Sequence, residues 1–148
     1  MSKLSENFRS LSDVWEFLRV AARLWAAQYL KARLPVPELL RRFTPPVRGV
    51  PQEDHADALQ RYVWWWLARP WFPVRSNCWT RSLALFELLR RHGFGDVGLV
   101  VGVRRDGADL SGHAWLIRGG VPFLEPTGEE VVGMRPMFTH PEEEAEEP

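Results

Sequence analysis

Apolar residues recur with a helical period over three stretches in the first two-thirds of the chain. The first stretch runs from Ser12 or Asp13, either of which can cap a helix, to about Leu34, where the following prolines end it. Asp13 and Glu16 have the spacing of a capping box. The positions predicted to share one face of this helix are Val14, Leu18, Ala21, Trp25 and Ala32.

Two further helices follow a proline-rich connector at residues 35–51, in which we expect one short turn near residues 38–43. The second helix is predicted over residues 52–69 and ends before Pro70. Its apolar face comprises Ala56, Leu59, Val63 and Trp66. The third helix begins at Asn77 and Cys78 and stops at Gly93. Its apolar positions cover most of the helix circumference, which predicts burial on most sides: Trp79, Leu83, Leu85, Phe86, Leu88 and Leu89.

The pattern changes from a helical to a strand period after Gly93. Residues 97–103 form a continuous β-branched run typical of a buried strand, and the polar residues 104–111 are predicted to form a loop. Residues 113–117 and 121–125 then predict a hairpin, and a weaker strand is expected at residues 131–132. Helices first and an antiparallel sheet second indicate an α+β domain.

The length of 148 residues fits one compact domain. Within it we expect a helical region at residues 1–74, a catalytic core at 75–138 and an acidic, disordered tail at 139–148. The 19 basic and 19 acidic residues balance to a formal charge of zero, which argues against nucleic acid as a partner.

A cytoplasmic location is expected from three features of the chain. The single cysteine cannot form an internal disulfide, so no oxidising compartment is implied. The first ten residues lack the pattern of a signal peptide. No apolar run reaches the roughly 18 uncharged residues that a transmembrane segment needs.

One thiol, one imidazole and one carboxylate follow one another along the last helix and the hairpin: Cys78, His113 and Glu125. A cysteine attacks as the thiolate, which the N-terminus of a helix and a neighbouring imidazolium both stabilise. Asn77 is a favourable N-cap, so Cys78 would lie in the first turn, where backbone N–H groups can also stabilise an oxyanion. We interpret Cys78 as nucleophile, His113 as general base and acid, and Glu125 as the carboxylate that orients the imidazole.

This triad depends on the length of the hairpin loop. With the two-residue loop Gly119-Gly120, the register would place His113 and Glu125 on opposite faces of the sheet. With the three-residue loop 118–120, His113 would lie directly opposite Glu125. Three-residue loops with glycine in the left-handed conformation are common in hairpins, and we therefore predict the longer loop.

The stretch NCWTRSLALFELLRRHGFGDVGLVVGV, followed by GHAW and LEP, resembles the lasso-peptide leader peptidases, a bacterial branch of the papain- and transglutaminase-like superfamily. These proteins share a cysteine followed by an Arg-(Ser/Ala)-Leu-Ala-Leu helix, a paired-arginine helix end with glycine, and a His-Ala-Trp strand. An acidic residue on the next strand completes their pattern. The resemblance covers about residues 75–126. It departs at Glu125, where the family more typically has aspartate.

The resemblance implies a papain/transglutaminase-like core, in which the nucleophile helix packs on an antiparallel sheet. It implies a cysteine peptidase that removes the leader from a ribosomally made precursor, with no cofactor or metal in the chemical step. A macrolactam cyclase of the same pathway would then close the freed core peptide. Residues 1–70 show no winged-helix module of the kind that recognises leaders, so a separate recognition protein is expected. Leaders of this family carry threonine next to last, and Trp79 and Trp115 are candidates for lining its pocket.

Each candidate residue also has a plain structural interpretation. A lone cysteine at a helix start is commonly a small buried hydrophobe, and a histidine in an apolar strand is commonly a hydrogen-bonded core residue. Zinc could use Cys, His and Glu, but no CxxC or HxxxH pair supplies further ligands. The remaining histidines are interpreted as surface residues: His55, His92 and His140. Other acyl-transfer chemistry, such as deamidation, and a non-catalytic peptide scaffold are the alternative functions.

Aromatic and basic residues near the candidate site leave two further alternatives open. The cluster of Trp64, Trp65 and Trp66 with Trp71 and Phe72 either packs the helical half onto the nucleophile helix or forms an exposed patch for a partner, a leader or a membrane surface. Arg75 and Arg81 flank Cys78, where they are either solvated or paired, or gather an acidic peptide.

Overall fold

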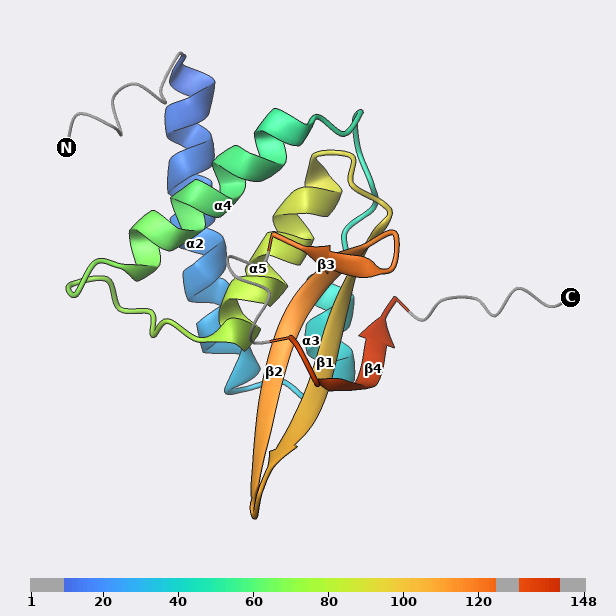
Figure 1. Cartoon of the computed structure of the whole chain (residues 1–148). Helices are drawn as coiled ribbons and strands as arrows, with labels where there is room; N and C mark the ends of the chain where they lie inside the picture. The colour runs from blue at the N-terminus through green and yellow to red at the C-terminus, as the bar shows by residue number, and fades with distance from the viewer. Residues whose placement is uncertain (1–9, 125–130, 142–148) are drawn as a thin grey trace, which may run out of the picture.

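The computed structural model describes residues 10–124 and 131–141, which form a helical layer and an antiparallel sheet (Figure 1). The helices are α2 (Leu11–Lys31), α3 (Val36–Arg42), α4 (Glu53–Leu67) and α5 (Cys78–Arg91). The strands are β1 (Val97–Asp106), β2 (Asp109–Arg118), β3 (Val121–Phe123) and β4 (Arg135–His140). The predicted α+β class is therefore confirmed.

Helix α5, which begins at Cys78, lies at the centre of the fold. It packs against α2 and α4 on one side and against β1 and β2 on the other (Figure 1). Every residue of α5 from Thr80 to Leu89 is buried, as its apolar circumference predicts. The same core cluster includes Leu24 of α2, Leu59 of α4 and Leu99 of β1. One hydrophobic core thus holds α5 in place from several directions.

The strands form one sheet in the order β3-β2-β1-β4, with each neighbouring pair antiparallel. The predicted polar loop at 104–111 is wrong, because β1 and β2 stay paired as far as Asp106 and Asp109. Gly107, with a φ of 63°, supplies the left-handed residue of the tight turn between them. These polar residues lie in the part of the β1–β2 hairpin that extends beyond the core. They are paired as strands although the sequence has no alternation of apolar and polar residues there. The strand predicted at 131–132 is also wrong, since that segment is a turn before β4.

The hairpin between β2 and β3 has a two-residue loop, and the predicted three-residue loop is wrong. Arg118 pairs with Val121, so only Gly119 and Gly120 form the turn. Both glycines have positive φ, 62° and 79°, as a two-residue turn of this twist requires. Arg118 belongs to the strand, where its guanidinium donates to Asp96.

Helix α2 buries a different face from the one predicted. Its buried residues are Phe17, Val20, Leu24 and Ala27. The predicted face is largely exposed, including Leu18 at 47% and Trp25 at 50%. The N-cap is Ser10, without a side-chain cap hydrogen bond, so the predicted cap at Ser12 or Asp13 is wrong as well. Both apolar stripes have helical spacing, and only the tertiary fold selects the one that meets α5 and α4.

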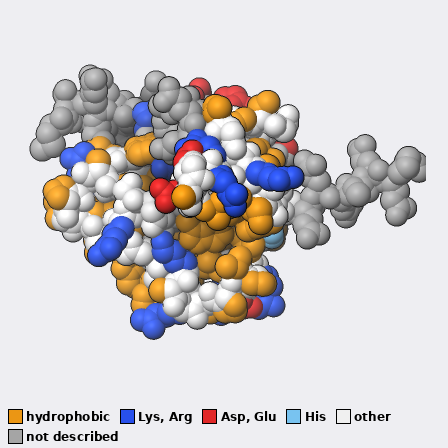
Figure 2. Space-filling view, turned by 60° about the horizontal axis from the view of Figure 1, so that its bottom comes forward, with side chains coloured by type: hydrophobic (Ala, Val, Ile, Leu, Met, Phe, Trp, Pro, Cys, Tyr) orange, Lys and Arg blue, Asp and Glu red, His pale blue; other side chains and the backbone are white. Residues whose placement is uncertain are grey.

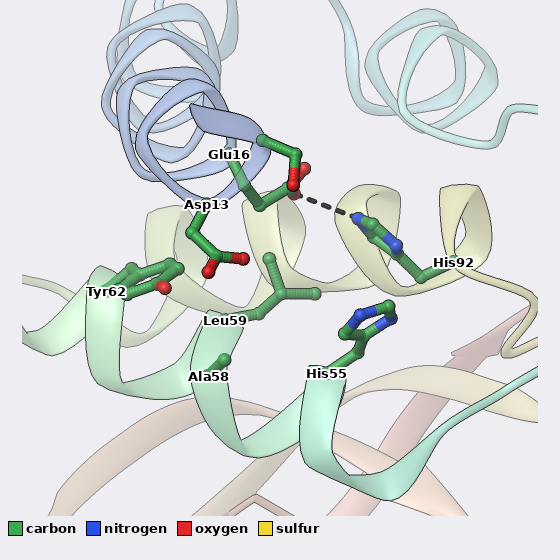
Figure 3. A pocket seen from close by; sticks show the side chains of 8 residues that line it. Asp13, Glu16, His55, Ala58, Leu59, Tyr62 and His92 are labelled. Carbon is green, nitrogen blue, oxygen red and sulfur yellow. Dashed lines mark hydrogen bonds and ion pairs between the residues drawn. The ribbon is translucent and has the colours of Figure 1, made fainter. Parts of the chain in front are cut away.

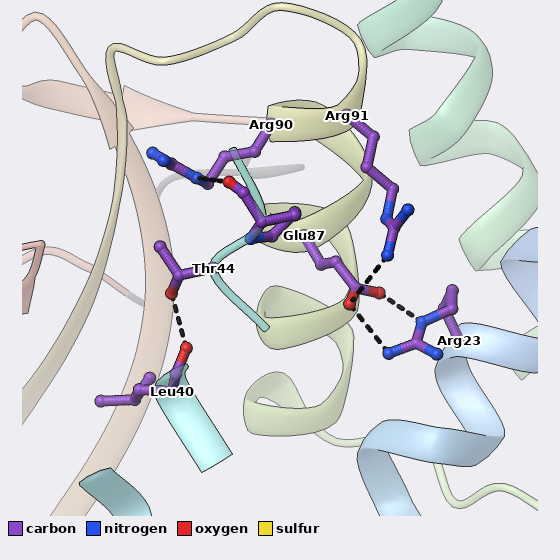
Figure 4. Close-up of polar contacts among 7 residues, drawn as sticks. Arg23, Leu40, Thr44, Glu87, Arg90 and Arg91 are labelled. Carbon is purple, nitrogen blue, oxygen red and sulfur yellow. Dashed lines mark hydrogen bonds and ion pairs between the residues drawn. The ribbon is translucent and has the colours of Figure 1, made fainter. Parts of the chain in front are cut away.

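A buried ion pair joins α2 to the middle of α5. The Glu87 side chain is fully buried and accepts hydrogen bonds from Arg23 Nε and, at 2.8 Å, from Arg23 Nη2 (Figure 4). Arg91 Nη2 lies 3.8 Å from the same carboxylate. Because a buried carboxylate is costly unless it is paired, Arg23 is the residue that makes Glu87 tolerable inside the core.

The tryptophans of α4 mainly pack the helical layer together. The Trp66 ring stacks on Phe17 at 4.7 Å, and its Nε1 donates to the Phe17 carbonyl at 3.0 Å. Trp65 meets the same phenylalanine edge-on at 5.1 Å. The Trp64 ring lies beneath the Arg81 guanidinium of α5 at 4.8 Å. Within the cluster of Trp64, Trp65, Trp66, Trp71 and Phe72, Trp71, which follows α4, is the largely exposed member, at 65%. The packing alternative therefore accounts for the three consecutive indoles.

Candidate active site

Cys78 is the first residue of α5 and is partly exposed. Asn77 is the N-cap, and its Oδ1 accepts a hydrogen bond from the Thr80 N–H at 2.8 Å. The N–H groups of Cys78 and Trp79 belong to the first turn, where no carbonyl of the helix can accept from them. The thiol thus lies at the positive end of a helix dipole, beside amides suited to stabilise an oxyanion.

Strand β2 contacts the Cys78 thiol through its backbone. The backbone N–H of Ala114 donates to Cys78 Sγ at 3.4 Å. The carbonyl of the same residue accepts from Ser82 Oγ, one turn further along α5, at 3.1 Å. Strand β3 pairs only with residues 116–118 of β2. The N–H and the carbonyl of Ala114 both bond to α5, and they link this helix to the strand that carries His113.

His113 lies on the same sheet face as Trp115, two residues further along β2. The two rings are nearly parallel, with centroids 5.9 Å apart and an interplanar angle of 15°. Trp115 in turn lies over Gly102 of β1, where an added Cβ would come within 2.6 Å of the indole. Both His113 and Trp115 are buried, at 7% and 3% exposure. Because Gly102 has no side chain, the Trp115 indole can lie over it and stack against the His113 imidazole.

Cys78 and His113 line the same cleft, which has a volume of about 540 Å³. Its described lining also includes Asn77, Arg81 and Arg104, together with Trp64, Ser76, Ser111, Gly112 and Met134. Trp79 and Trp115 are not among the described residues that line it. Trp79 packs against the hydrophobic core instead. The cleft is open to solvent, and the Cys78 thiol in its lining is partly exposed.

Glu125, the third residue of the predicted triad, lies outside the described residues. The described register is that of the two-residue loop, which by itself would place residue 125 opposite Ala114 rather than His113. However, β3 ends at Phe123, and Leu124 has a positive φ of 59°. The described pairing of β3 with β2 therefore ends at Phe123. The hairpin argument for Glu125 is lost, whereas the placement of Cys78 and His113 does not depend on it.

Two residues of α2 reach the candidate site and were not predicted from the sequence. Lys31 Nζ donates to Thr80 Oγ1 at 2.9 Å. Gln28 Nε2 donates to the Pro73 carbonyl at 2.8 Å, and its Oε1 accepts from the Arg75 N–H. Both lie more than 40 positions from their partners in the sequence, so no local pattern could have identified them.

A second cavity of about 200 Å³ lies at the opposite end of α5, between the N-terminal turns of α2 and α4 (Figure 3). His92 Nε2 lies 2.9 Å from Glu16 Oε1, and the His55 ring is 5.1 Å from the His92 ring. Burial alone would raise the pKa of Glu16, but the hydrogen bond and positive charge of His92 outweigh it and lower that pKa below 4.5. His92 is thus a structural partner of α2 rather than a surface residue.

His140 is likewise engaged, since its Nε2 lies 2.8 Å from Thr44 Oγ1 and its ring meets Phe86 edge-on. Within residues 10–124 and 131–141, no group of three His, Cys, Asp or Glu side chains is arranged to hold a metal ion. In the same part of the chain, no helix combines the length and apolar character required to cross a bilayer.

The comparison with known families gives one match. Residues 17–139 match the model of the transglutaminase-like superfamily, from α2 through α5 to β4. No curated protein and no solved structure matches the chain significantly. This superfamily includes cysteine proteases and acyltransferases, in keeping with a thiol at a helix N-terminus beside a histidine strand. The chain belongs to the transglutaminase-like superfamily.

Proposed function

We propose that the protein is a cysteine peptidase that removes the leader from a lasso-peptide precursor. The observation that carries the catalytic part is the meeting of Cys78 and His113 in one open cleft, with the thiol at the N-terminus of α5. The leader-peptidase part is supported by the sequence resemblance over residues 75–126. The proposed partners are the precursor, a separate recognition protein of winged-helix type and the macrolactam cyclase of the same pathway.

In the proposed reaction, His113 takes the proton of Cys78, and the thiolate attacks the scissile carbonyl. The first-turn amides of α5 stabilise the resulting oxyanion. His113 then protonates the leaving amine, which is the N-terminus of the core peptide, and the leader remains as a thioester on Cys78. Water, activated by the same imidazole, hydrolyses the thioester and frees the thiol.

The test is to incubate the protein with a precursor peptide and its recognition protein, and to identify the products by mass spectrometry. We expect cleavage at one site, no cleavage by Cys78→Ala, and a loss of about 1,000-fold or more in His113→Ala. His55→Ala is the matched control. This exposed histidine belongs to α4 and lies beside His92, at the end of α5 opposite to Cys78. Cleavage retained by Cys78→Ala would refute the peptidase proposal.

The same experiment separates the alternative functions. A mass increase of one unit without cleavage would indicate deamidation, and binding without any product would indicate a peptide scaffold. Glu125→Gln tests the carboxylate separately. If Glu125 orients His113, its amide variant cleaves more slowly, whereas a wild-type rate removes Glu125 from the mechanism.

A further inference from the structure

The last turn of α2 forms hydrogen bonds with residues that precede and follow Cys78 in the sequence. Before Cys78, the Gln28 amide binds the backbone of Pro73 and Arg75. After Cys78, Lys31 Nζ donates to Thr80 Oγ1 at 2.9 Å. The Thr80 side chain cannot easily move away, because this residue is fully buried and its N–H is bound to the N-cap. The ammonium of Lys31 is therefore fixed within the first turn of the nucleophile helix.

A cation at this place is electrostatically unfavourable without an anion. The N-terminus of a helix carries about half a positive charge and repels ammonium groups. The first turn of α5 contains no acidic residue. No carboxylate in the part of the chain that the structure describes lies within ion-pair distance of Lys31. The pKa of Lys31 is lowered, because the effect of burial outweighs the opposing effect that the charge of a Cys78 thiolate would have.

The described residues that line the cleft include no carboxylate. The described charged and titratable groups that line it with Cys78 are Arg81 from α5, Arg104 from β1 and His113 from β2. All three are cationic or become so on protonation. Figure 2 shows Lys and Arg side chains distributed among hydrophobic side chains over one face of the molecule. Among the residues that the structure describes, Cys78 is the group whose negative charge, once the thiol is ionised, would act on the Lys31 ammonium.

We propose that Lys31 is a positioning residue whose ammonium, held by Thr80, keeps Cys78 in the reactive thiolate form. This inference rests on the proposed function only in treating Cys78 as the nucleophile. Lys31 acts through its charge and does not contact the substrate. Its contribution should therefore appear in the chemistry of the thiol alone, with no peptide present.

The test is the rate at which iodoacetamide alkylates Cys78, the only thiol of the chain, measured as a function of pH. We expect Lys31→Met to slow alkylation roughly tenfold near pH 6.5, where the thiolate fraction limits the rate. Near pH 9.5, where thiols are largely ionised, the variant and wild type should react within about twofold. Lys31→Arg should restore most of the rate at the lower pH. Thr80→Val, which keeps the charge but removes its anchor, should give an intermediate rate.

Arg33→Met is the matched control. It removes one positive charge two residues further along, from a side chain that lies over the Tyr29 ring at 4.1 Å rather than beside Cys78. This variant should react like wild type at both pH values. A wild-type rate for Lys31→Met at low pH would overturn the proposal. A decrease of equal size at both pH values would also overturn it, because it would indicate altered access to the thiol. Thermal melts establish that each variant is folded.

The two proposals can fail separately. If no peptide is cleaved but Lys31→Met still slows alkylation only at low pH, the role of Lys31 stands and the peptidase proposal fails. If Cys78-dependent cleavage is found while alkylation of Lys31→Met matches wild type, the opposite conclusion holds.

Discussion

Replacing Arg23 by methionine tests whether the buried Glu87 depends on its partner for the stability of the fold. Methionine keeps much of the aliphatic stem but removes the guanidinium. The Glu87 carboxylate would then keep only Arg91, at 3.8 Å, which is beyond hydrogen-bond distance. Leaving a buried charge without its hydrogen-bonded partner costs about 3–5 kcal/mol. Since the Arg23 side chain is 28% exposed, water can partly replace it, and we expect about 3 kcal/mol.

The assay is urea unfolding at neutral pH, followed by tryptophan fluorescence and circular dichroism. The double variant Arg23→Met with Glu87→Leu should recover most of the loss, because a hydrophobic pair of similar volume can replace a buried ion pair at little cost. The control is Arg41→Met, whose partner Glu38 lies on the surface and whose own side chain is 75% exposed. It should change the free energy of unfolding by less than about 0.5 kcal/mol.

Two results would refute this reasoning. One is an Arg23→Met variant no less stable than Arg41→Met, which would mean that water or Arg91 satisfies the Glu87 carboxylate. The other is a double variant whose loss of unfolding free energy equals the sum of the losses for Arg23→Met and Glu87→Leu measured separately. Such additivity would mean that the two residues are not coupled.

Three further changes have defined outcomes. Asn77→Ala should lower the free energy of unfolding by about 1 kcal/mol through loss of the N-cap, and Asn77→Ser should restore it, as urea titration will show. Gly102→Ala should cost about 2 kcal/mol, because its Cβ would overlap Trp115. Gly112→Ala, which faces only ordinary contacts, should stay near wild type in the same assay. The pKa of Glu16 is lowered in the folded state, so its stabilising contribution should be present above pH 4.5 and lost as the pH falls further. Glu16→Gln should flatten that part of the curve of unfolding free energy against pH, and an unchanged slope would contradict the assignment.

The sequence is most informative where one face of an element is unambiguous. Apolar residues cover most of the circumference of helix α5. Its burial on most sides could therefore be predicted without knowing which elements pack against it. The buried face of α4 was also predictable, because Ala56, Leu59 and Val63 form one narrow stripe. Asn77 next to the only cysteine marked the start of α5 from residue type alone.

Helix α2 and the sheet show where local pattern is insufficient. Two apolar stripes run along α2, and periodicity cannot decide whether Phe17 or Trp25 faces the core. The paired glycines 119 and 120 fit either loop length, and the strand position of Arg118 is decided by its distant partners Asp96 and Glu53. The charges of Glu87 and Lys31 likewise acquire their roles only through contacts between distant parts of the chain.

The contacts around Cys78 have a consequence for the newly made chain. The donor from Ala114 lies 36 residues after the thiol, and the residue pair Lys31–Thr80 is separated by 49 positions. An unfolded chain has none of these groups near the sulfur, and it has no helix dipole to act on it. During synthesis, residue 78 is therefore an ordinary cysteine, slow to react with electrophiles or oxidants. The reactivity that we propose for this thiol would therefore arise only when α2, α5 and β2 have assembled, and it would be a property of the folded chain alone.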